Sequence, residues 1–105
     1  MHLIKRLEEL IEDEIQDIET YAELAAQVKA DHPGLAQVLY TISTQEDSHQ
    51  AALHTEVVKI IEEYKRTHGE PPAAMKAVYD FMHKRHIENL AEARRYQDIY
   101  LQGEA

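Results

Sequence analysis

Hydrophobic residues recur every three or four positions along most of this chain, which is the spacing of one face of an α-helix. Two short stretches, at residues 30–34 and 67–72, interrupt the pattern and hold all three prolines and two of the three glycines. We therefore expect three helices, at about residues 2–30, 35–67 and 73–101. Because short connections favour antiparallel neighbours, the predicted fold is all-α: an up-and-down bundle in a single domain, residues 1–105.

Each predicted helix carries one apolar stripe that is suited to packing against its neighbours. The stripes comprise Leu7, Ile11, Ile18, Tyr21, Ala25 and Val28 in the first helix; Leu35, Leu39, Ile42, Leu53, Val57, Ile60 and Tyr64 in the second; and Met75, Val78 or Tyr79, Met82, Leu90, Ala93, Gln97 and Tyr100 in the third.

Polar residues interrupt each stripe near the middle of its helix. The interrupting residues are Glu14 in the first helix, Glu46 and His49 in the second, and His86 in the third. These side chains are expected to face the core, where a carboxylate is costly unless it is paired, hydrogen-bonded, protonated or bound to metal.

A bound metal ion would compensate the cost of these polar side chains, because carboxylate oxygens and imidazole nitrogens are ligands for iron, manganese and zinc. Glu46 and His49 are three residues apart and so point the same way from one helical turn. In an antiparallel pair, Glu14 lies at a similar height to Glu46, within the shift that helix tilt allows. The pattern thus predicts Glu14, Glu46 and His49 as metal ligands.

The segment of residues 14–21, followed by Glu46-Asp47-Ser48-His49, resembles the first half of rubrerythrins and encapsulated ferritins of the ferritin-like superfamily. In those families a ligand glutamate precedes a tyrosine by seven residues, and Glu-x-x-His follows on the next helix. The resemblance covers residues 7–64 and implies a di-iron carboxylate site, with Glu46 as the bridge between two metals. It also implies that Tyr21 is a redox or supporting residue near the site.

The chain departs from the family pattern in two respects. The third helix holds no second Glu-x-x-His, and the chain has no cysteine for the rubredoxin part of a rubrerythrin. A two-fold homodimer would supply the missing half and complete four carboxylates and two histidines in a four-helix core. We therefore expect a homodimer or higher homo-oligomer that shares two irons, with Mn or Zn as alternatives and a separate electron donor as partner.

Simpler interpretations stand beside the metal site. His86 is either a further ligand, a hydrogen-bond partner of Glu14 or Glu46, or a satisfied core histidine. His83, three residues earlier, can join His86 on a metal, although solvation at the edge of the bundle is the simpler account. Tyr21 is most simply a core residue, and the acidic run of the first helix, which includes Glu8, is mostly a solvated face.

Composition narrows the function classes further. With 20 acidic and 11 basic residues the net charge is -9, which disfavours binding to nucleic acid or anionic membranes. No apolar run approaches a membrane span, and the N-terminus leads into acidic residues, so we expect a cytoplasmic protein. Three functions remain: an iron-oxidising di-iron protein, a metal-binding bundle without turnover, and a helical interaction protein in which the site is a vestige.

Overall fold

Within residues 2–103, which the computed structural model describes, the chain forms three helices and no strand. They are α1 (His2–Val28), α2 (Pro33–His68) and α3 (Ala73–Gln102). The all-α prediction is confirmed, and each predicted boundary lies within two residues of the observed one. In the same part of the chain, no helix is long and apolar enough to cross a membrane.

The two interruptions in the hydrophobic pattern separate the three helices, as the sequence predicts. Pro33 occupies the first turn of α2, where its missing N–H leaves no bond unmade, and His32 precedes it without a side-chain capping bond. Gly69 ends α2 with a φ of 81° and donates its amide to the carbonyl of Lys65. A positive φ favours glycine, so α2 ends at the residue before Gly69.

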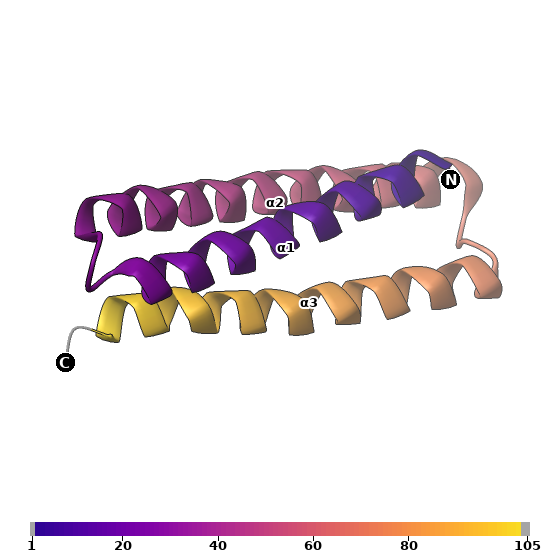
Figure 1. Cartoon of the computed structure of the whole chain (residues 1–105). Coiled ribbons are helices and arrows are strands. Elements are labelled where there is room, and N and C mark those ends of the chain that lie inside the picture. The colour runs from indigo at the N-terminus through magenta and orange to yellow at the C-terminus, as the bar shows by residue number, and fades with distance from the viewer. Residues whose placement is uncertain (1, 104–105) are drawn as a thin grey trace.

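The bundle is long and thin, with extents of 56 × 18 × 17 Å. Figure 1 shows α1 lying against both α2 and α3, while α2 and α3 make few contacts with each other. The exposed area of 6815 Å² exceeds the value of about 6,100 Å² expected for a compact protein of this mass. The shape therefore leaves unusually large helix faces open to solvent.

The stripe of α3 is buried as predicted, whereas the stripes of α1 and α2 are displaced by about one position near the predicted ligands. In α1 the stripe runs through Ile15, which is 3% exposed, so Glu14 lies at its edge. Leu35, which the sequence predicts in the stripe of α2, is half exposed. The neighbouring Ala36 and Leu39 pack against the ends of α1 and α3 instead. In α3 Tyr79, rather than the exposed Val78, contacts the core.

Polar groups at the centre of the bundle connect the three helices. The fully buried Ser43 donates its hydroxyl to the carbonyl oxygen of Ile18 at 2.8 Å and accepts a hydrogen bond from Gln97 at 3.0 Å. In the C-terminal half of α3, Arg94 donates two hydrogen bonds of 2.9 Å to the carboxylate of Asp47 on α2. These bonds fix the height of α2 relative to its neighbours, and hence the height of residues 46–49 against α1.

Candidate metal centre

Glu14 of α1 and Glu46 and His49 of α2 converge at the edge of the core. One ligand atom from each lies within 4.8 Å of the other two. His49 Nδ1 is 3.7 Å from Glu14 Oε2 and 3.9 Å from Glu46 Oε1. Atoms that share one ion through bonds of about 2.0–2.2 Å lie about 3–4 Å apart, so the three donors need only small movements to bind one ion.

The three side chains differ in exposure. Those of Glu14 and Glu46 are 26% and 19% exposed, whereas that of His49 is 59% exposed. The group therefore opens to solvent on the histidine side and is backed by the core on the carboxylate side. The sequence predicted side chains facing the core, and the one-position shift of the stripes moves them to its edge.

Electrostatics at this group favour a bound cation. The pKa of Glu14 is raised to about 7, first by a hydrogen bond with Glu46, then by burial and by the charge of Glu46. Such a bond requires that one of the two carboxyls carry a proton. Among the described residues no donor reaches Glu14 Oε2, although that atom is buried. A cation can take the place of the shared proton and satisfy this oxygen.

Neighbouring acids add negative charge without joining the group. The pKa of Asp17 is raised by burial and then by the charges of Glu46 and Asp13. The pKa of Asp47, in contrast, is lowered because Arg94 hydrogen-bonds its carboxylate. Asp47 therefore belongs to the α2–α3 contact and not to the metal-ligand group. The two carboxylates and one imidazole of Glu14, Glu46 and His49 suit iron, manganese or zinc.

Tyr21 lies seven residues beyond Glu14, about 10 Å along α1. Its ring packs beside the cluster of Ala25, Ala36, Leu39 and Tyr100. This surrounding agrees with the simpler interpretation of Tyr21 as a core residue, and the metal-ligand group does not include it.

His86 lies against a residue that the sequence did not single out. Its Nδ1 is 3.0 Å from Glu8 Oε2, and both side chains are less than a tenth exposed. The assignment of Glu8 to a solvated face was wrong, because Glu8 falls on the stripe between Ile4 and Ile11. The spacing of four and three residues from these isoleucines was the signal that could have identified it.

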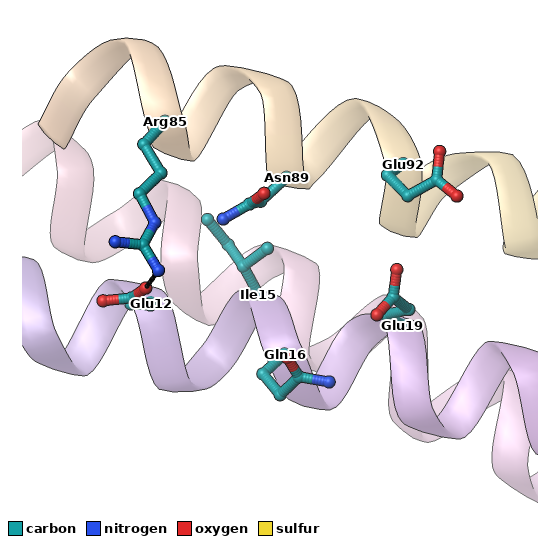
Figure 2. A pocket seen from close by; sticks show the side chains of 7 residues that line it. All are labelled: Glu12, Ile15, Gln16, Glu19, Arg85, Asn89 and Glu92. Atoms are coloured by element: carbon teal, nitrogen blue, oxygen red, sulfur yellow. Dashed lines mark ion pairs between the residues drawn. The ribbon is translucent and has the colours of Figure 1, made fainter. Parts of the chain in front are cut away.

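A separate polar hollow of about 280 Å³ lies between α1 and α3 and holds none of the three predicted ligands. Figure 2 shows Arg85 reaching from α3 to Glu12 of α1, an ion pair of 2.9 Å, with Glu19 and Glu92 facing each other further along. Glu92 is also paired with Arg95. Most charged side chains that line the hollow are thus already paired. The group of Glu14, Glu46 and His49 is therefore the better candidate for metal binding.

Comparison with protein-family models, curated proteins and solved structures finds no match to this chain. The ferritin-like resemblance therefore depends on residues 14–21 and 46–49 alone.

Proposed function

We propose that this protein binds Fe(II) through Glu14, Glu46 and His49, shares two irons between two copies of the chain, and oxidises them. The observation that carries the proposal is the convergence of these three side chains around a buried carboxylate oxygen that has no donor in the described residues. Two carboxylates that face each other favour a proton or a cation between them.

The surface around the group supports a second copy as the missing half. Leu3, Leu10 and Leu24 of α1 are 58%, 42% and 41% exposed and are spaced at multiples of seven residues, which places them along one face. Glu14 lies one turn beyond Leu10 on the same side of that helix. Leu35 and Val38 at the start of α2 are likewise exposed, at 50% and 55%. A partner that covers this face would bring two half-sites together.

Fe(II) is the substrate of the proposed reaction. Two Fe(II) ions lose one electron each, and O₂ takes up the two electrons and two protons to give hydrogen peroxide. Glu14 and Glu46 hold the ions close together and offset their growing positive charge during oxidation. His49, the most exposed of the three, supplies the nitrogen ligand on the solvent side.

The test is an anaerobic Fe(II) titration of the metal-free protein, followed by a pulse of air that is monitored in the near ultraviolet. We expect saturation at about one iron per chain and oxidation on exposure to air. Glu46→Ala and His49→Ala should abolish both signals. The matched controls Glu62→Ala and His68→Ala change the same residue types elsewhere on α2 and should leave both signals intact.

The other outcomes discriminate between the remaining functions. Binding without oxidation would contradict turnover and favour a metal-binding bundle. Absence of binding in the wild-type protein would contradict the metal site and favour a helical interaction protein. In that case Glu14→Leu should stabilise the fold, because a partly buried carboxyl beside a second acid costs more than an apolar side chain at the edge of the core.

A further inference from the structure

Three of the seven histidines of the chain line one cleft between α2 and α3. They are His54 of α2 and His83 and His86 of α3, and the cleft has a volume of about 260 Å³. His54 is eight residues beyond Glu46, about 12 Å further along α2. The cleft is therefore separate from the proposed iron site.

The imidazoles of His54 and His83 face each other across the cleft. Their ring centres are 5.1 Å apart and their planes differ by 13°. Two imidazoles that bind one tetrahedral ion through bonds of about 2.0 Å also have ring centres about 5 Å apart. The helices thus hold the two ring centres at a suitable separation. Because the rings stack with nearly parallel planes, both must rotate for their nitrogens to meet at a shared ion.

The third histidine is oriented by a buried carboxylate. Glu8 of α1 lies 3.0 Å from His86 Nδ1, which favours the proton on that nitrogen and leaves the Nε2 lone pair free. A carboxylate behind a histidine is the arrangement that commonly fixes the orientation of a metal-binding imidazole. His83 and His86 are three residues apart on α3 and therefore share one face of the helix.

We propose that this cleft is a second metal site, with His54, His83 and His86 as ligands and Glu8 as the residue that positions His86. A set of imidazoles suits borderline ions such as Zn²⁺, Ni²⁺ and Cu²⁺, whereas the carboxylate-rich group suits harder ions. The two sites differ in ligand chemistry, and the site in the cleft does not depend on the proposed iron oxidation. An ion there would also join α2 to α3, which otherwise make few contacts.

The test is a calorimetric titration with Zn²⁺ of the Glu46→Ala/His49→Ala variant, which lacks two ligands of the first group. We expect this variant to bind about one zinc per chain. Adding His54→Ala or His83→Ala should weaken binding at least about tenfold, and Glu8→Gln should weaken it about tenfold without changing the stoichiometry. His54 is partly exposed and His83 is exposed, so these two replacements leave the core intact.

The matched control is His68→Ala in the same background, because His68 also stacks on an aromatic ring but lies at the end of α2. Absence of zinc binding in the background variant would overturn the proposal, as would an equal loss of affinity in the His68 variant. Fe(II) oxidation by the otherwise wild-type His83→Ala protein tests the first site independently. Failure of either site is therefore distinguishable from failure of the other.

Discussion

Glu8 of α1 and His86 of α3 form a buried contact of 3.0 Å across the bundle, with side chains that are 9% and 8% exposed. It lies among the isoleucines of the main core and joins α1 to α3, away from the exposed ion pair of Arg85 with Glu12. A polar pair in such a place is costly to break, because the remaining partner is left without compensation.

We expect His86→Ala to lower the free energy of unfolding of the metal-free protein by about 3 kcal/mol, measured by urea denaturation. Replacing both residues, as in Glu8→Leu/His86→Leu, should cost much less because no uncompensated polar group remains. Asp80→Ala is the control, since it breaks the exposed Lys76–Asp80 pair and should cost less than about 0.5 kcal/mol. A loss below 1 kcal/mol in the single variant, on the order of the control, would show that the buried pair contributes little.

The fold was predictable because its signals are local. Helical periodicity, Pro33 at the start of α2 and Gly69 at its end set the helix boundaries without reference to tertiary structure. The choice of which face is buried is different, because it depends on how three helices share one narrow core. A stripe that shifts by one residue exchanges Glu14 for Ile15, and the sequence alone does not fix that shift.

The candidate site was predictable in part for the same reason. Glu46 and His49 are close because of spacing within one helix, and the short loop brings Glu14 to their height. The contact of Glu8 with His86 joins residues 78 positions apart, and the ion pair of Asp47 with Arg94 joins residues 47 apart. No local pattern in the sequence identifies a partner on another helix, so neither of these contacts was predictable.

The Asp47–Arg94 pair predicts a pH-dependent contribution to stability. Arg94 lowers the pKa of Asp47, so the pair stabilises the fold above the ordinary pKa of 3.8 and loses its effect as the pH falls through the lowered value. We expect Arg94→Ala to cost about 1 kcal/mol at pH 7, allowing for solvent screening of the half-exposed arginine. Denaturation at pH 7 and in strong acid should show the difference vanishing in acid. Arg95→Ala, which breaks a pair within α3, is the control and should cost less.

Glu14 predicts the opposite dependence on pH. Its pKa is raised from 4.5 to about 7 in the folded protein, first by the hydrogen bond with Glu46. The folded state therefore holds a proton that the unfolded state has lost between these values, and stability of the metal-free protein falls as the pH rises through this window.

Glu14→Gln should remove that fall and stabilise the metal-free protein at pH 8 by about 1 kcal/mol, after allowance for screening. Thermal denaturation at pH 5 and pH 8 in the presence of a chelator measures the effect. Glu62→Gln on the exposed face of α2 is the matched control and should leave the pH profile unchanged. A wild-type profile that is flat between pH 5 and pH 8 would contradict the shared proton.

The proposed dimer predicts that charge on the α1 face disrupts association. Leu10 and Leu24 are exposed on the side of α1 that carries Glu14, so Leu10→Lys/Leu24→Lys would bury two cations in the interface. We expect the variant to have the mass of one chain in light scattering and to lose oxidation of Fe(II), while keeping its helix content. Phe81→Lys is the control, because Phe81 is 65% exposed on α3, outside the proposed interface. A wild-type protein that has the mass of one chain with iron bound would exclude the shared site. A wild-type dimer that the leucine variant leaves intact would instead place the interface on another face, since lysines at the contact are incompatible with close apolar packing.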